Sequence, residues 1–181
     1  MKKTAVIVGR FQAHKLTEGH KNLIREVITK CEQLIIFVGV YPLKADFKNP
    51  LPYEIREWML YEFLPPYVLV SHNVKIAPIV DVFNIPLWSN NLDQQIKFLV
   101  NSYNETELLE NVTMYGSRDS FIFNYKGMFK THEVKANGDD SASKLREEIK
   151  NMDIHNVDES FRKGIIWSLR NKYLFFIIHF K

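Results

Sequence analysis

An apolar run is followed directly by glycine, basic and histidine residues in the segment 5–20, AVIVGRFQAHKLTEGH. This pattern is suited to binding an anion. Arg10, Thr17 and His20 supply polar side chains, while Gly9 and Gly19 stand where the backbone must approach a ligand. A periodic apolar pattern begins just after His20, so the segment predicts a strand, a tight loop and a helix N-terminus with Thr17 as N-cap. Free N–H groups and the helix dipole at such a terminus favour phosphate. We therefore predict a phosphate site contacted by Arg10 and His20.

The composition is that of a globular α/β protein. The chain has 181 residues, 46% hydrophobic, with a formal net charge of +3. This mild charge does not favour nucleic-acid binding, which needs a clustered basic surface, but it leaves phosphorylated small molecules open. Cys31 has no second cysteine to pair with, and neither a signal peptide nor a membrane-spanning stretch is visible. We expect a reducing, cytoplasmic location with no membrane partner.

Short β-rich apolar runs alternate with segments of helical periodicity. The predicted strands are Thr4–Val8, Leu34–Val40, Tyr67–Val70, Lys75–Val80, Val112–Tyr115 and Met128–Val134. The predicted helices are Glu18–Glu32, one from Asn49-Pro50 to Phe63, Leu92–Tyr103, one from Ser141, and Glu159–Arg170. The predicted loops are Asp81–Asn91, with Trp88, and Asn137–Asp140, and the Phe- and Ile-rich tail Tyr173–Lys181 is a final strand or a subunit contact.

This alternation predicts a Rossmann-like, doubly wound α/β fold with a parallel sheet of about five strands and a short helical C-terminal appendage. We expect one domain over residues 1–181, with its core at about 4–150 and the C-terminal helix and tail at about 151–181. Ligands of such sheets bind beyond the carboxyl ends of the strands. Those ends are expected at Gly9-Arg10, Gly39, Asp81 and Gly116.

Two motifs resemble the nucleotidyltransferase superfamily. The first is G-R-F-Q at 9–12 followed by T-E-G-H at 17–20, which is neither a dinucleotide fingerprint nor a P-loop. The second, S-x-[ST]-x-x-R, stands at Ser141–Arg146. Ser143 and Arg146 are three residues apart and would share a helix face. Arg146 could then bind two phosphate oxygens with its planar guanidinium.

Three further segments narrow the resemblance. They are KNPLPYEIR at 48–56, the segment from Ile79 to Trp88, and GSRDS at 116–120. Together with the two motifs they resemble nicotinamide-mononucleotide adenylyltransferases, of the bacterial and phage type that often carries a C-terminal Nudix hydrolase domain. No Nudix box is present, so we expect a transferase without that domain. Thr17 stands where this type usually has histidine, a place that His14 could take.

The resemblance implies roles for individual residues. The implied catalytic residues are Arg10, Thr17, His20 and Arg146. The implied ATP-binding residues are Gly9, Phe11, His14, Gly19, Lys48, Gly116, Arg118, Ser141 and Ser143. Asp81, Asn84 and Trp88 would bind the mononucleotide, with the charged nicotinamide ring stacked on Trp88. Mg²⁺ would be held by the triphosphate and water, with no metal ligand expected from the protein.

The function expected from this resemblance is transfer of AMP from ATP to nicotinamide mononucleotide, giving NAD and pyrophosphate. The mononucleotide phosphate attacks directly, and His20, Arg10 and Arg146 would supply positive charge. Two alternatives stay open. One is adenylyl or cytidylyl transfer to another acceptor, such as nicotinate mononucleotide or phosphopantetheine. The other is a nucleotide-binding sensor without catalysis. The apolar tail also leaves a homo-oligomer open.

Overall fold

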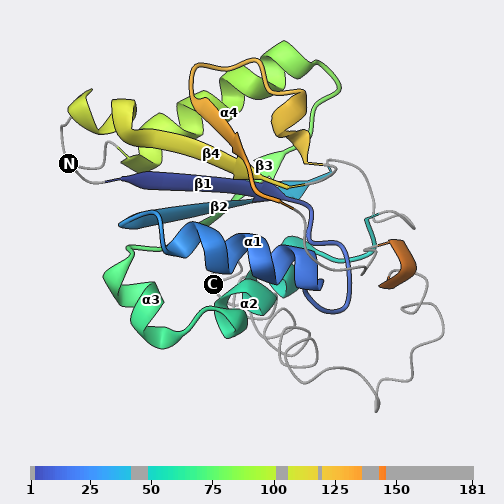
Figure 1. The fold of residues 1–181 in the computed structure, drawn as a ribbon. Coiled ribbons are helices and arrows are strands. Elements are labelled where there is room, and N and C mark those ends of the chain that lie inside the picture. Colours follow the sequence, from blue (N-terminus) through green and yellow to red (C-terminus); the bar gives the residue numbers. More distant parts are fainter. Residues whose placement is uncertain (1–2, 42–48, 101–105, 118–119, 136–142, 146–181) are drawn as a thin grey trace, which may run out of the picture.

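The short apolar runs form one parallel sheet. The computed structural model describes residues 3–41, 49–100, 106–117, 120–135 and 143–145, and the strands below are those of this part of the chain. They are β1 (Thr4–Gly9), β2 (Gln33–Val40), β3 (Lys75–Val80), β4 (Val112–Gly116) and β5 (Lys130–Glu133). Their order is β3-β2-β1-β4-β5, and every neighbouring pair is parallel (Figure 1).

The two central strands are buried on both faces. In β1, for example, Val6 and Ile7 point to opposite faces of the sheet, and each is at most 1% exposed. This burial explains their continuous apolar runs, which are typical of covered parallel strands. The chain goes from β1 to β2 and β3 on one side, then returns to β4 and β5 on the other. The winding therefore reverses at β1, where such sheets bind their ligands.

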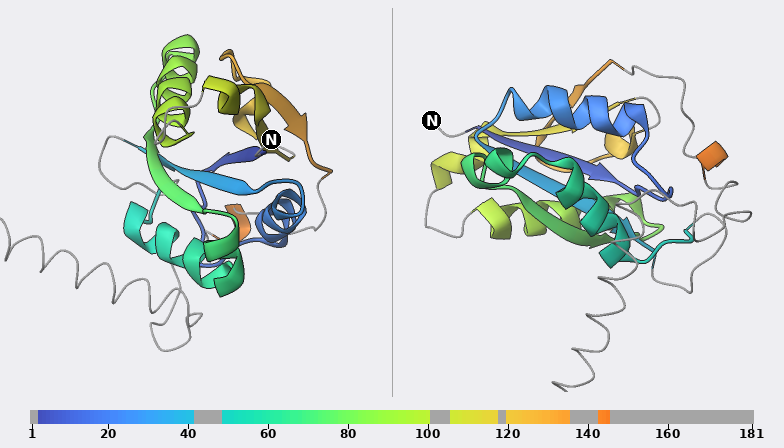
Figure 2. Two further views of the ribbon diagram at one scale, coloured as in Figure 1. Left: turned by 90° about the vertical axis from the view of Figure 1, so that its left-hand side faces the viewer. Right: turned by 90° about the horizontal axis from the view of Figure 1, so that it is seen from below.

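Helices cover both faces of the sheet. They are α1 (Glu18–Ile28), α2 (Tyr53–Phe63), α3 (Pro66–Ser71) and α4 (Ile85–Val100), with 3-10 turns at Thr106–Asn111 and Phe121–Phe123. The first three lie on one face and α4 lies on the other (Figures 1 and 2). Each face has its own apolar core, one around Ile24 and Leu60 and one around Leu92 and Ile96. The predicted doubly wound α/β fold is confirmed.

The segment Tyr67–Val70 is helical, so the strand predicted there is wrong. It forms most of α3, which starts at Pro66, the helical position where a missing N–H does no harm. The Val68 N–H then bonds to the Pro65 carbonyl at 2.9 Å. The proline pair therefore starts a helical turn that outweighs the β-propensity of a short apolar run.

The loop predicted at Asp81–Asn91 is also wrong, because α4 begins at Ile85. The Asn84 side chain accepts a hydrogen bond from the Leu87 N–H at 2.9 Å, as an N-cap residue does. Trp88 therefore lies in the first turn of a helix. Ile85 and Leu87 are 42% and 49% exposed, and these solvent-facing apolar side chains obscure the helical period in the sequence.

The other boundaries differ by a few residues. Helix α1 ends at Ile28 instead of Glu32, and Cys31 is buried in the turn that follows. The predicted loop at 137–140, the helix at 159–170 and the tail from 173 lie outside the described residues. Among the residues that are described, no helix is both long and apolar enough to cross a membrane.

Candidate nucleotide-binding site

A cavity of about 270 Å³ opens at the carboxyl ends of β1, β2 and β3. It is lined by Val8, Gly9, Arg10, Gly39, Tyr41, Asp81, Val82, Phe83, Ile85, Trp88, Phe121 and Asn124. This volume is close to the lower end of the range for small-molecule sites, about 300 Å³. The predicted strand ends Gly9-Arg10, Gly39 and Asp81 do meet at one edge of the sheet, and Gly116 ends the neighbouring β4.

One wall of the cavity is aromatic. Trp88 is 8% exposed, and its ring packs edge-on against Phe121 with 5.0 Å between centroids. The indole N–H of Trp88 has no hydrogen-bond partner among the described residues. The wall therefore combines apolar ring surface with one buried donor.

The cavity lining also contains an ion pair. Arg10 Nη2 lies 3.0 Å from Asp81 Oδ2, and the two side chains are 57% and 23% exposed. Gly39 lies under this pair, since a Cβ there would approach Arg10 Cγ to 3.4 Å and Asp81 Oδ1 to 3.5 Å. The Arg10 guanidinium is therefore held at the mouth of the cavity by a carboxylate.

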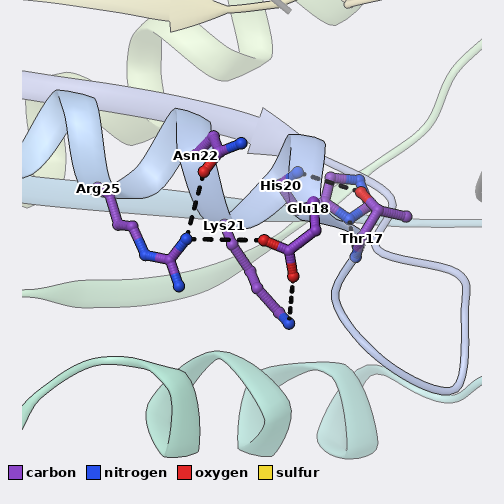
Figure 3. Close-up of polar contacts among 6 residues, drawn as sticks. All are labelled: Thr17, Glu18, His20, Lys21, Asn22 and Arg25. Carbon is purple, nitrogen blue, oxygen red and sulfur yellow. Dashed lines mark hydrogen bonds and ion pairs between the residues drawn. The ribbon is translucent and has the colours of Figure 1, made fainter. Parts of the chain in front are cut away.

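A reciprocal capping box forms the N-terminus of α1 (Figure 3). Thr17 Oγ1 accepts the His20 N–H at 3.1 Å, and the Thr17 N–H donates to His20 Nδ1 at 3.3 Å. The predicted N-cap is confirmed, and the His20 side chain is part of it. Glu18 turns outward to Lys21, with a distance of 2.7 Å from Nζ to Oε1.

The His20 ring is oriented from two sides. It packs on Phe11 with 4.9 Å between ring centroids, while its Nδ1 accepts the bond from Thr17. The neutral ring therefore carries its proton on Nε2, which is left as a hydrogen-bond donor. Burial lowers the pKa of His20 to about 4. The expectation that His20 carries a positive charge is wrong for the free protein, because at neutral pH the ring is a neutral donor.

The glycines of the first motif differ in what they allow. A Cβ at Gly9 would come within 2.8 Å of the ring of Phe11. Phe11 itself has a backbone φ of 49°. Gly9 is therefore needed for packing. A Cβ at Gly19 would meet only Thr17 Oγ1, at 3.6 Å, so the described residues do not require glycine at this place.

The described part of the second motif, residues 143–145, lies next to the loop after β1. His14 is 4% exposed, and its Nδ1 is 3.1 Å from the Leu145 carbonyl oxygen, 131 residues further along the chain. The helical turn at 143–145 therefore packs on the loop after β1, and Ser143 is exposed on it. The other predicted site residues, Lys48, Arg118, Ser141 and Arg146, lie outside the described residues.

Arg56 lies near the site, and none of the roles expected from the sequence falls on it. It is 2% exposed, and its Nη1 donates to the carbonyl oxygens of Gly39 and Arg10 at 2.6 and 2.7 Å. One sequence signal could have revealed it, since Arg56 stands on the same helical face as Met59 and Leu60. An arginine on an apolar helix face needs buried acceptors.

The model of the cytidylyltransferase-like family matches residues 6–148. The chain belongs to the cytidylyltransferase-like family. Within this family's fold, the matched region contains the cavity, the capping box and the turn at 143–145.

One curated relative of this chain is the nicotinamide-nucleotide adenylyltransferase of Sulfurisphaera tokodaii. It is 34% identical over 89 residues, which are 49% of this chain and 51% of the relative. The chain therefore matches about half the length of that relative.

Solved structures share the fold. A bifunctional NMN adenylyltransferase/ADP ribose pyrophosphatase from Francisella tularensis, complexed with AMP and a manganese ion, has a TM-score of 0.65 at 19% identity. The alignment covers 88% of this chain and 44% of that one. A NadR protein in complex with NAD and AMP-PNP has a TM-score of 0.59 at 21% identity, with 91% and 47% covered.

Proposed function

We propose that this protein transfers AMP from ATP to the 5′-phosphate of nicotinamide mononucleotide, releasing NAD and pyrophosphate. One observation carries the proposal. Consecutive residues connect an aromatic-walled cavity to a helix N-terminus, since Arg10 lines the cavity and Phe11 packs on His20. A site for two phosphorylated substrates needs this arrangement, with a pocket for one ring and a phosphate cradle beside it. The name of the Sulfurisphaera relative supports the same reaction.

The cavity suits the acceptor ring. A nicotinamide ring carries a positive charge, which is attracted to the face of an aromatic side chain and to a carboxylate. Trp88 and Asp81 offer these two partners in the cavity wall. The name of the Sulfurisphaera relative, a nicotinamide-nucleotide adenylyltransferase, favours the amide as acceptor over nicotinate mononucleotide. Asn84 caps α4 with its side chain, and the contact that we predicted between Asn84 and the mononucleotide remains a proposal.

The N-terminus of α1 suits the triphosphate. The space at Gly19 lets a phosphate approach the backbone, and His20 Nε2–H donates to an oxygen there. Ser143 lies on the turn that packs against this loop through His14. The resemblance adds Lys48, Gly116, Arg118, Ser141 and Arg146 as further contacts.

The reaction needs positioning more than acid–base catalysis. An oxygen of the mononucleotide phosphate, already anionic, forms a bond to the α-phosphorus of ATP, and the bond to the pyrophosphate oxygen breaks with its electron pair. No proton has to be removed. Arg10 and the His20 donor stabilise the charge that develops on the phosphates.

A divalent cation fits this site as part of the nucleotide substrate. The described residues contain no group of three His, Cys, Asp or Glu side chains able to hold a metal ion. The donors that are present, an arginine, an N–H of histidine and helix N–H groups, suit phosphate oxygens instead. We propose that Mg²⁺ arrives on the triphosphate, where it neutralises charge.

The test is incubation of the purified protein with ATP, MgCl₂ and one acceptor at a time, with product detection by mass spectrometry. The acceptors are nicotinamide mononucleotide, nicotinate mononucleotide and phosphopantetheine, and CTP replaces ATP in a parallel series. We expect NAD and pyrophosphate in equal amounts, and faster turnover with the amide than with the acid. A faster reaction with phosphopantetheine or CTP would assign another acceptor or donor. Tight ATP binding with no product from any pair would instead indicate a sensor.

A further inference from the structure

Arg56 is a buried cation directly beside the candidate site. It lies on the inner face of α2, among the largest fully buried side chains of the described residues. Its Nη1 donates to the Gly39 and Arg10 carbonyls at 2.6 and 2.7 Å, and its Nε donates to the Pro52 carbonyl at 3.2 Å. The side chain therefore ties α2 to the backbone of two strand ends.

The two strand carbonyls stand where β1 ends. Gly9, the last residue of β1, pairs with Val38, so Arg10 and Gly39 are the next residues along two adjacent parallel strands. Both residues also line the cavity. Arg56 thus holds the cavity floor from the face of the sheet that carries α2, while α4 covers the other face.

The three hydrogen bonds of Arg56 named above all end on backbone carbonyl oxygens, which carry no net charge. They are therefore not ion pairs. Burial lowers its pKa to about 10, while Asp81 favours the charged form and Arg10 opposes it. Arg56 therefore stays protonated at neutral pH and remains electrostatically coupled to the Arg10–Asp81 pair. A buried cation costs stability compared with an apolar side chain of similar size, which points to a role besides packing.

We propose that Arg56 is a positioning residue for the transfer reaction, which fixes the Arg10 and Gly39 backbone and thereby aims the Arg10 guanidinium at the transferred phosphate. This inference rests on the proposed function. Arg56 acts through Arg10, whose carbonyl it holds, because its own side chain is buried and is not among the residues that line the cavity. Among the described residues, the ion pair with Asp81 then remains to hold the Arg10 side chain when the Arg56 bonds are lost.

The test is a double-mutant cycle on steady-state NAD formation, with Arg56→Gln, Arg56→Lys, Arg10→Met and both combinations. Misplacement of a catalytic group can reduce turnover by about 10²-fold. We expect kcat to fall by at least about tenfold in Arg56→Gln, with partial rescue in Arg56→Lys, which keeps the charge. In the Arg10→Met background, Arg56→Gln should change kcat by less than about twofold, because coupled residues are not additive.

The matched control is Met59→Ala, on the same face of α2 and 2% exposed. It lowers the melting temperature through a cavity but should leave kcat within about twofold. The proposal would be overturned if Arg56→Gln lowered kcat by the same factor in the wild-type background and in the Arg10→Met background. Absence of NAD formation by the wild-type protein would instead overturn the proposed function.

If no Arg56 variant folds, ¹⁵N-arginine NMR of the wild-type protein tests the coupling between Arg56 and the phosphate site. Pyrophosphate binding should shift the Arg56 Nε–H resonance. An unchanged resonance would contradict the coupling.

Discussion

At the scale of single residues, His20 combines two functions in one ring. Its Nδ1 accepts the bond that completes the helix cap, and this bond leaves Nε2 as a donor of fixed direction. Phe11 holds the ring from the other side. A donor oriented in this way before the substrate arrives loses little entropy when a phosphate binds, which is the condition for strong charge stabilisation.

His20→Ala should lower kcat for NAD formation by about 10²–10³-fold, the effect of removing one oriented donor from a charged transition state. Steady-state kinetics with saturating ATP and mononucleotide measures it, and circular dichroism checks that the fold persists. His132→Ala, an exposed histidine on β5, is the control and should keep wild-type turnover. Turnover of His20→Ala within a few-fold of wild type would rule out the phosphate role.

Trp88→Phe should raise the KM for nicotinamide mononucleotide about tenfold and leave the KM for ATP unchanged. Phenylalanine keeps much of the packing against Phe121 but offers a weaker partner to a cationic ring and removes the unpaired indole N–H. Trp58→Phe in α2, on the other face of the sheet, is the matched control. An equal rise in both KM values for Trp88→Phe would indicate a general loss of packing instead of stacking.

At the scale of elements, the first turn of α1 explains the threonine at position 17. The Thr17 side chain is the acceptor for the His20 N–H and is itself 5% exposed. The side chain at position 17 therefore caps the helix, and this cap holds the His20 ring in position. This is a structural reason for a departure from the histidine expected there.

Thr17→Ala should lower the free energy of unfolding by about 1 kcal/mol, the usual cost of losing an N-cap side chain. For a chain of this size that corresponds to a drop in melting temperature of roughly 2–4 °C. Thr17→Ser keeps the oxygen and should retain most of the stability. Thermal unfolding of the three proteins side by side measures both effects. Serine as destabilising as alanine would show that the methyl group matters and the cap does not.

At the scale of the whole molecule, the site joins segments far apart in the chain. Helices on opposite faces of the sheet contribute to it, with His20 from α1, Arg56 from α2 and Trp88 from α4 (Figure 1). The depressed pKa of His20 then couples the site to global stability, because protonation of this ring is disfavoured only in the folded state.

The free energy of unfolding should decrease as the pH falls from about 6.5 to about 4. In this range the unfolded chain protonates His20, whose folded pKa is about 4, so acid favours unfolding. The loss reaches up to about 3 kcal/mol and levels off below the folded pKa. Urea titrations of wild type and His20→Ala at several pH values isolate this contribution as their difference. A difference that does not vary with pH would show that the folded pKa is not depressed.

The local pattern of residues was enough to predict the parallel α/β fold, the N-cap at Thr17 and the strand ends that line the cavity. These features depend on periodicity and capping within about ten residues, which a sequence displays directly. Where local signals conflicted, the prediction was wrong, as at Tyr67–Val70, where prolines opposed β-propensity. The same conflict hid the start of α4, because its first turn exposes apolar side chains.

Only the tertiary structure revealed the partners of the buried polar groups. Arg56 bonds to carbonyls 17 and 46 residues away, and His14 to one 131 residues away. The neutral state of His20 likewise follows from burial by the packed chain. Such contacts depend on which strand ends the sheet brings together, and no spacing within a segment contains that information. Residue types and local spacing thus determined which chemistry the loop after β1 offers, and packing decided how its side chains are held and charged.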